Sequence, residues 1–200
     1  MKKIALIVFA VLLKTVLLAQ EQPKFGLKGG LNLAKLKATQ YASSDLDFRA
    51  SAHVGGLAHI HLTPQWALQP EVVYSGQGMK QQYQGSNYTW KLDYLNIPVM
   101  IQYMFNNGFR IEAGPQLGIL LGAKFENDET LKNDLKTTDF SVGAGISYLS
   151  NSGLGVGVRY NHGVTNINNR PNRSTYKLNN RVLQLGLFYL FDHSHKAKSR

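Results

Sequence analysis

The side chains best suited to acid–base chemistry are charged groups scattered along the chain. They are Lys28, Glu71, Arg110, Glu112, Lys124 and Arg159. Glu71 and Glu112 could act together as the acid and base of a glycosidase-type reaction. The alternative is that all six form an ion-pair network inside the fold, because buried charges must be paired. The choice depends on the elements that position them.

Three histidines form a second candidate site. His53, His59 and His61 are separated by even numbers of residues, so on a strand all three lie on the same face. A His-x-His pair on a strand can present two metal ligands. No third ligand stands at a predictable spacing, so we favour packing or rim contacts and expect no metal, no cofactor and no catalytic residue. The chain has no Cys, which excludes thiolate metal sites, Cys nucleophiles and disulfides.

The elements that carry these residues have a period of two. The chain has 200 residues, which is enough for one domain. Its apolar content of 44% is too high for a disordered protein. The clearest segment is 109–125. One face has Phe109, Ile111, Ala113, Pro115, Leu117, Ile119, Leu121, Ala123 and Phe125; the other has Arg110, Glu112, Gly114, Gln116, Gly118, Leu120, Gly122 and Lys124. Such separation is typical of a strand, not a helix.

Seven further segments alternate in the same way, at about 24–34, 50–62, 65–78, 90–105, 139–149, 154–163 and 181–191. Three connections are short and rich in Gly, Asn or Pro, at 63–65, 106–108 and 150–153. Four are long and polar, at 35–49, 79–89, 126–138 and 164–180. Strict alternation of short and long connections predicts an all-β, eight-stranded antiparallel up-and-down barrel.

The apolar face of this barrel is predicted to point outwards into lipid. An eight-stranded barrel has a narrow interior, which the large apolar side chains would overfill. The opposite face is rich in Gly, Ser and Asn, which suit a narrow polar lumen. Aromatic residues gather at both strand ends, as in the girdles of a membrane barrel. Trp90 and Phe125 are expected in the girdle at the long-loop end. The six charged residues would then line a lumen too narrow for a sugar chain, which favours the ion-pair network.

The two ends of the chain are predicted to lie outside the barrel domain, residues 20–191. Residues 1–19 begin with two lysines followed by an apolar run, as in a secretory signal peptide. Their removal would take away three lysines and lower the net charge from +10 to +7. Residues 192–200 form a short basic C-terminal tail beyond the last aromatic residue. The mean hydropathy of −0.21 resembles that of a soluble protein only because it averages an apolar outer face with a polar lumen and loops.

Several motifs resemble those of the small outer-membrane β-barrel proteins of Bacteroidota, the PorT-like group. They are FGLKGGLNL from Phe25, LQPEVVYS from Leu68, LDYLNIPV from Leu92, EAGPQLG from Glu112 and GVRYN from Gly157. The resemblance covers nearly the whole chain after the leader. It implies an eight-stranded barrel in the bacterial outer membrane and little about activity, although PorT itself resembles a component of a secretion system.

We therefore expect a non-catalytic structural or interaction component of the cell envelope, monomeric and without nucleic acid. Residues 126–139 carry a net charge of −3 and residues 165–181 a net charge of +4. The basic loop could meet lipopolysaccharide or an envelope protein partner. Two alternatives stay open: an outer-membrane lipid-modifying enzyme, and a soluble secreted lipocalin-like barrel that binds a small ligand.

Overall fold

Eight long strands build the molecule. The computed structural model describes residues 22–38, 46–83, 86–125, 129–130, 132–170 and 177–191. The long strands are β1 (Lys24–Ala38), β3 (Arg49–His61), β4 (Trp66–Tyr83), β5 (Ser86–Met104), β6 (Phe109–Phe125), β8 (Thr138–Leu149), β9 (Leu154–Gly163) and β10 (Leu178–Leu190). The short elements are β2 (Leu46–Asp47), β7 (Glu129–Thr130) and the 3-10 turn η3 (Lys132–Asp134).

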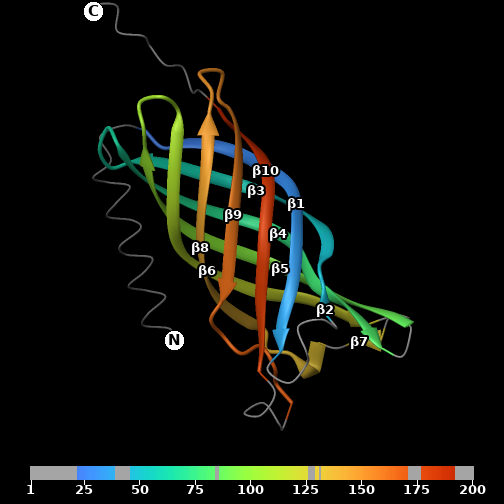
Figure 1. Cartoon of the computed structure of the whole chain (residues 1–200). Helices are drawn as coiled ribbons and strands as arrows, with labels where there is room; N and C mark the ends of the chain where they lie inside the picture. Colours follow the sequence, from blue (N-terminus) through green and yellow to red (C-terminus); the bar gives the residue numbers. More distant parts are fainter. Residues whose placement is uncertain are drawn as a thin grey trace, which may run out of the picture.

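The eight long strands close into an antiparallel barrel. Each pairs with the next in the chain, and β1 closes the circle by pairing with β10 from Gly26–Leu190 to Ala38–Leu178. The short turns lie at one end, at the top of Figure 1, and the long connections lie at the other end with β2 and β7. The predicted eight-stranded up-and-down barrel is confirmed.

One predicted loop is mostly strand. The segment 79–89 was expected to be a long connection, but β4 and β5 continue to pair from Met79–Trp90 to Tyr83–Ser86. The polar composition that suggested a loop reflects the position of this hairpin beyond the apolar band. The backbone N–H and C=O groups still pair across the hairpin, because hydrogen bonds between two antiparallel strands do not depend on an apolar face.

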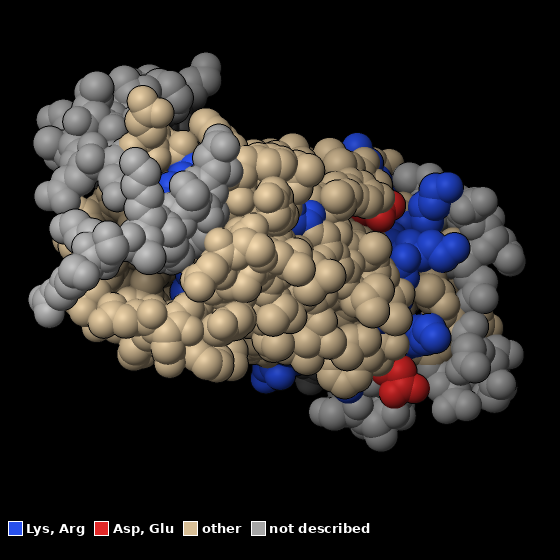
Figure 2. Space-filling model, turned by 90° about the horizontal axis from the view of Figure 1, so that it is seen from above, with Lys and Arg blue, Asp and Glu red and all other residues tan. Residues whose placement is uncertain are grey.

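The apolar face points away from the lumen, as predicted. Leu27, Leu31, Val54, Ile146 and Leu187 are each about 60% exposed, from 58% to 61%. In Figure 2 the middle of the visible surface is almost all tan, and charged side chains gather towards one end. A soluble ligand-binding barrel would bury these side chains instead, so the soluble alternative is wrong.

Aromatic side chains mark the short-turn end of this outer face. Trp66 and Tyr103 meet edge to face with ring centroids 5.1 Å apart, and Tyr103 meets Phe105 at 5.0 Å. Phe109 and Tyr148 lie 5.3 Å apart on the neighbouring strand pair. Such a belt fits the level of the lipid headgroups, where an aromatic ring has one apolar and one wet side.

The lumen is not polar throughout, which corrects the expectation of a wholly polar interior. An apolar cluster fills its long-loop end: Leu36, Met79, Leu92, Tyr94, Leu120, Ala123, Leu135 and Ile167. Trp90, predicted in the outer girdle, packs against this cluster. A smaller cluster of Leu57, Leu149 and Leu190, with Phe188 against it, lies towards the short turns. The barrel is therefore plugged by apolar side chains on both sides of its polar middle.

A β-bulge reverses part of the predicted alternation in β6. Asp93 pairs with Gly122 but Tyr94 pairs with Leu120, so Leu121 is an extra residue in β6. Beyond this point the sides of the strand exchange, because one inserted residue shifts a period-two pattern by half a period. Ala123 is consequently buried in the lumen cluster. Lys124 is exposed, so the prediction that Lys124 faces the lumen is wrong.

Two predicted segments, the signal peptide 1–19 and the tail 192–200, lie outside the described residues. Both stay predictions. No helix within the described residues is long and apolar enough to cross a membrane.

Candidate functional site

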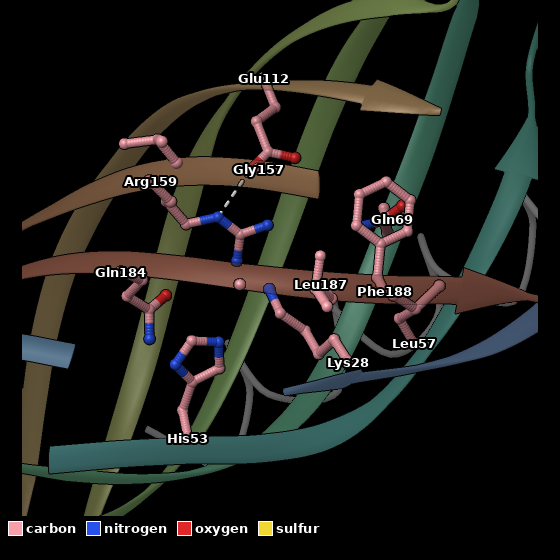
Figure 3. A pocket seen from close by; sticks show the side chains of 12 residues that line it. Lys28, His53, Leu57, Gln69, Glu112, Gly157, Arg159, Gln184, Leu187 and Phe188 are labelled. Carbon is pink, nitrogen blue, oxygen red and sulfur yellow. Dashed lines mark hydrogen bonds and ion pairs between the residues drawn. The ribbon is translucent and has the colours of Figure 1, made fainter. Parts of the chain in front are cut away.

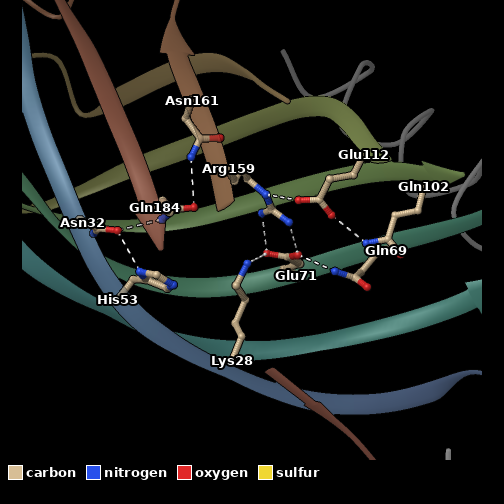
Figure 4. Close-up of polar contacts among 10 residues, drawn as sticks. All are labelled: Lys28, Asn32, His53, Gln69, Glu71, Gln102, Glu112, Arg159, Asn161 and Gln184. Atoms are coloured by element: carbon tan, nitrogen blue, oxygen red, sulfur yellow. Dashed lines mark hydrogen bonds and ion pairs between the residues drawn. The ribbon is translucent and has the colours of Figure 1, made fainter. Parts of the chain in front are cut away.

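Four of the six predicted charged residues form one network across the middle of the lumen (Figure 4). Arg159 on β9 donates two hydrogen bonds to the Glu71 carboxylate, from Nη1 to Oε2 at 2.9 Å and from Nη2 to Oε1 at 2.7 Å. Its Nε donates to Glu112 Oε1 at 2.6 Å. Lys28 Nζ donates to Glu71 Oε2 at 2.9 Å. These residues stand on β1, β4, β6 and β9, so the network ties four strands across the barrel.

Glutamine side chains complete the coordination of both carboxylates. Gln69 Nε2 donates to Glu71 Oε1 at 2.8 Å, and Gln102 Nε2 donates to Glu112 Oε2 at 2.7 Å. Glu71 is only 2% exposed and Arg159 only 5%. Every carboxylate oxygen therefore has a donor. Both carboxylates are thus engaged within the network, whereas a general acid or base must reach a substrate directly or through one water.

A second polar layer lies on the long-loop side of this network. Asn161 Nδ2 donates to Gln184 Oε1 at 3.1 Å, and Gln184 Nε2 donates to Asn32 Oδ1 at 3.1 Å. Asn32 also donates to Ser75 Oγ at 2.9 Å. The chain of amides visible in Figure 4 links β9, β10 and β1, and the bond from Asn32 to Ser75 extends it to β4. The alternation of side chains predicted these amides on the inward face, but their linkage into one layer was not predicted.

The space that remains between these side chains is very small. A cavity of about 40 Å³ lies beside Lys28, His53, Glu112 and Arg159 (Figure 3). A cavity needs a volume of at least about 10–15 Å³ to hold one water molecule, so this cavity holds a few waters at most. It is far below the roughly 300 Å³ at which pockets for small ligands begin. The middle of the lumen is neither a pore nor a substrate pocket.

The three histidines all point inwards but do not converge on one point. His53 Nδ1 lies 2.9 Å from Asn32 Oδ1 within the amide layer. The rings of His59 and His61 meet edge to face at 4.7 Å, nearer the short turns. No group of three or more His, Cys, Asp or Glu side chains is placed to hold a metal within the described part of the chain. The geometry assigns His53 to the polar packing of the lumen.

Arg110 lies apart from the network that the sequence suggested for it. It is 5% exposed and faces the lumen from β6, one inward position nearer the short turns than Glu112. Both Glu112 oxygens are already hydrogen-bonded, to Arg159 and Gln102. The Nη1 atom of Arg110 is buried without a hydrogen-bond partner. Arg110 is thus close enough to Glu112 to be attracted by it, but it forms no hydrogen bond with that carboxylate.

The two oppositely charged loops meet across the outer end of the barrel, which the sequence did not predict. Arg170 Nη2 lies 2.8 Å from Asp134 Oδ2. The backbone of Lys136 donates to Ile167 O at 2.8 Å, and Leu135 forms a bridge with Asn168. Leu135 and Ile167 complete the apolar cluster below. The opposite net charges of the two loops were the only sequence signal, and the contact closes the outer mouth.

The comparisons with known proteins agree with this architecture. Two solved structures resemble it: Ail, the attachment invasion locus protein of Yersinia pestis, and Neisserial surface protein A (NspA). Ail shows 13% identity and a TM-score of 0.54, and NspA shows 16% and 0.53; each match covers 86% of this chain and 100% of the other. These likenesses show the fold. A search of the curated proteins found no significant match.

The family assignment comes from the sequence itself. The family model for the outer membrane protein beta-barrel domain matches residues 18–169, well over half of the chain. This match agrees with the closed barrel, its apolar outer face and its aromatic belt, and it locates the protein in the bacterial outer membrane. The chain belongs to the outer membrane protein beta-barrel domain family.

Proposed function

We propose that this protein is a non-catalytic, monomeric structural or interaction component of the outer membrane that acts through the surfaces at its two ends. The observation that carries the proposal is the filled lumen. Its middle is occupied by paired charges and amides, and its ends by apolar side chains. Because the described lumen has no passage and no free carboxylate pair, other molecules can meet this barrel only at its ends and on its outer surface.

The outer wall at the long-loop end fits an anionic lipid headgroup. Lys35 on β1 pairs in register with Arg181 on β10, and both are on the outward face. Two residues nearer the membrane middle, Leu33 pairs with Leu183. Two residues along a strand span roughly 7 Å. The change from apolar to basic therefore occurs over the depth at which hydrocarbon gives way to phosphate.

A shallow cavity of about 360 Å³ opens beside this basic row. It is lined by Lys37, His162, Lys177, Asn179 and Arg181. Several cations that surround one space favour a multiply charged anion. We infer that lipopolysaccharide phosphates bind here and anchor the barrel in the outer leaflet.

The finer identity follows the sequence motifs. We infer that the chain is a PorT-like protein of Bacteroidota that is exported after loss of residues 1–19 and serves secretion or surface assembly. The motifs that support this proposal include FGLKGGLNL from Phe25 and EAGPQLG from Glu112. The tail 192–200 would then lie in the periplasm, on the side of the short turns.

Two experiments test the proposal, the first on intact outer membranes and the second on the purified protein. Cross-linking followed by pull-down should recover a stoichiometric envelope neighbour, and purified barrel in planar bilayers should show no stable conductance. Recovery of the monomer alone would reject a protein partner, and steady ion conductance would reject the filled lumen.

The lipopolysaccharide site has its own test with a matched control. Purified protein carrying Lys37→Gln and Arg181→Gln should retain less lipopolysaccharide than the wild type, whereas Lys24→Gln, at the opposite end of β1, should retain the wild-type amount. Equal retention by all three proteins would refute the site. Mass spectrometry of lipid A with and without the gene tests the enzyme alternative, and a changed lipid A structure would replace this proposal with that one.

A further inference from the structure

Arg110 is a buried cation that forms no ion pair with any described residue. Glu112, two residues along β6, attracts it, but both oxygens of that carboxylate are bonded to Arg159 and Gln102. The inward charges near it are Lys28, Glu71, Glu112 and Arg159, two basic and two acidic, and they are bonded to one another. Arg110 adds a third positive charge. Burial of an unpaired ion costs several kcal/mol even after the surroundings relax, so a group of opposite charge is needed beside it.

A neighbouring hydroxyl also lacks a partner. Ser147 on β8 lies directly opposite Arg110 in the β6–β8 register. Its Oγ is buried without a hydrogen bond, as is Arg110 Nη1. Buried polar groups in native proteins are nearly always hydrogen-bonded, and two adjacent exceptions call for an explanation. Arg110 can only donate, and a hydroxyl donates as well as accepts, so one acceptor placed between them would satisfy both groups.

Arg110 lines a cavity large enough for such a partner. The cavity has a volume of about 430 Å³ and surrounds the turn between β5 and β6 at the short-turn end of the barrel. One water occupies about 30 Å³ of liquid, whereas pockets for small ligands begin near roughly 300 Å³. In outer-membrane barrels the short turns face the periplasm, so a ligand would enter from that side.

The walls of the cavity combine amide donors with apolar surface. Asn106, Asn107 and Asn151 supply side-chain amides, and Met104 and Leu149 supply apolar contacts. A single guanidinium matches a singly charged carboxylate in planar, two-point geometry. The apolar wall suits a hydrocarbon side chain next to that carboxylate.

We propose that this cavity binds the carboxylate of a peptide segment from a periplasmic partner, with Arg110 as its receptor and an apolar side chain of the segment against Met104 and Leu149. The inference rests on the proposed interaction function and names the chemistry recognised at the periplasmic end. It makes Arg110 a binding residue, whereas Arg159 is structural. The buried positive charge of Arg110 is thus explained as the group that binds the partner's carboxylate.

The test uses the full barrel in phosphatidylcholine nanodiscs and follows the Arg110 Nε–H signal by NMR. The probe is N-acetyl-leucine, with N-acetyl-leucinamide as the neutral match and inorganic phosphate as a second anion. We expect a saturable shift with N-acetyl-leucine, and binding weaker by roughly tenfold or more for the amide, since a charge-assisted pair is worth more than about 1.4 kcal/mol. Stronger binding of phosphate than of N-acetyl-leucine would overturn the carboxylate assignment.

Variants separate binding from folding. Arg110→Gln should lose the response to N-acetyl-leucine, followed through the backbone amides of the 106–108 turn, and Arg110→Lys should keep part of it. Arg170→Gln, at the opposite end, should bind like the wild type. Because Arg110 forms no ion pair with any residue that the structure describes, Arg110→Gln should be at least as resistant to thermal unfolding as the wild type. Unchanged binding in Arg110→Gln would overturn the proposal, while cross-linking to an envelope neighbour through the outer loops would leave the proposed function standing.

Discussion

Replacement of Arg159 by Met is the most direct test of what holds the barrel together. The change keeps a long apolar side chain in place and removes the positive charge. Arg159 donates three hydrogen bonds to two carboxylates, all between 2.6 and 2.9 Å. After the change, Lys28 still bonds Glu71, whereas Glu112 keeps only the neutral Gln102 side chain as a hydrogen-bond donor.

The size of the effect follows from the burial of these groups. The Glu71 side chain is fully buried, and the side chains of Arg159 and Glu112 are 6% and 7% exposed. Removal of one member of a buried, hydrogen-bonded charge set destabilises a protein by about 3–5 kcal/mol, because the remaining charge is left without compensation. The matched control is Arg170→Gln, since the Arg170–Asp134 pair has 52% and 42% exposed side chains. An exposed pair is worth roughly 0–1 kcal/mol.

The assay is urea unfolding in lipid vesicles, followed by tryptophan fluorescence and by the gel mobility shift of the folded barrel. We expect Arg159→Met to lose about 3–5 kcal/mol and Arg170→Gln at most about 1 kcal/mol. The double variant Arg159→Met, Glu112→Gln should regain most of the loss, because the two charges that remain buried, Lys28 and Glu71, are bonded to each other. Similar losses for Arg159→Met and Arg170→Gln, or no recovery in the double variant, would refute the reasoning.

Three further changes test other parts of the fold. Gly30→Ala should lower stability by about 1–3 kcal/mol, because its Cβ would overlap a β10 backbone carbonyl, and Gly29→Ala, with an ordinary contact at 3.5 Å, should not. Leu36→Ala should cost about 2–5 kcal/mol by opening a cavity in the lumen cluster, more than Leu31→Ala on the lipid face, both by urea unfolding. In this cysteine-free chain, Lys124→Cys should react with a water-soluble maleimide in intact membranes; protection from the reagent would contradict the bulge.

The barrel was predictable because its sequence repeats a simple physical requirement. A lipid-facing wall and a narrow lumen demand opposite side chains at successive residues, and this period of two runs through the long strands except at the β6 bulge. The segment from Arg110 to Gln116 follows the rule residue by residue, and its register with β8 agrees from Phe109–Tyr148 onwards. Glycine-, asparagine- and proline-rich turns supplied the remaining boundaries.

The bulge was not predictable by the same reasoning. Alternation in 109–125 continues without a visible break, because Leu120 and Leu121 are both apolar and Gly122 fits either side. The extra residue is set by the pairing of β5 with β6 at Asp93 and Tyr94, which is a property of two strands together. A pattern read along one strand carries no information about a shift in its partner, and Lys124 was misplaced for that reason.

The two apolar clusters in the lumen were not predicted, because the period-two pattern was taken to mean an apolar outer face and a wholly polar inner face. Leu36, Leu92 and Leu120 share the inward side with polar residues. Their inward position lets them pack over the amide layer and keep water away from it. Side chains on the lipid-facing side cannot do this. Burial at a strand end is set by what closes the mouth, here Leu135 and Ile167 from two distant loops.

Arg110 and Arg159 show what determines function in a barrel of this kind. Both are arginines on the inward side, each is 5% exposed, and the sequence treats them alike. Depth along the axis separates them: Arg159 lies where two carboxylates meet it, and Arg110 lies next to a cavity at the short turns. A charge in the middle of a filled lumen can only stabilise the fold, because no partner can reach it. Arg110 lies beside a cavity at the short turns that a partner can reach, and for this reason we place the proposed interaction at the end of the barrel rather than in its middle.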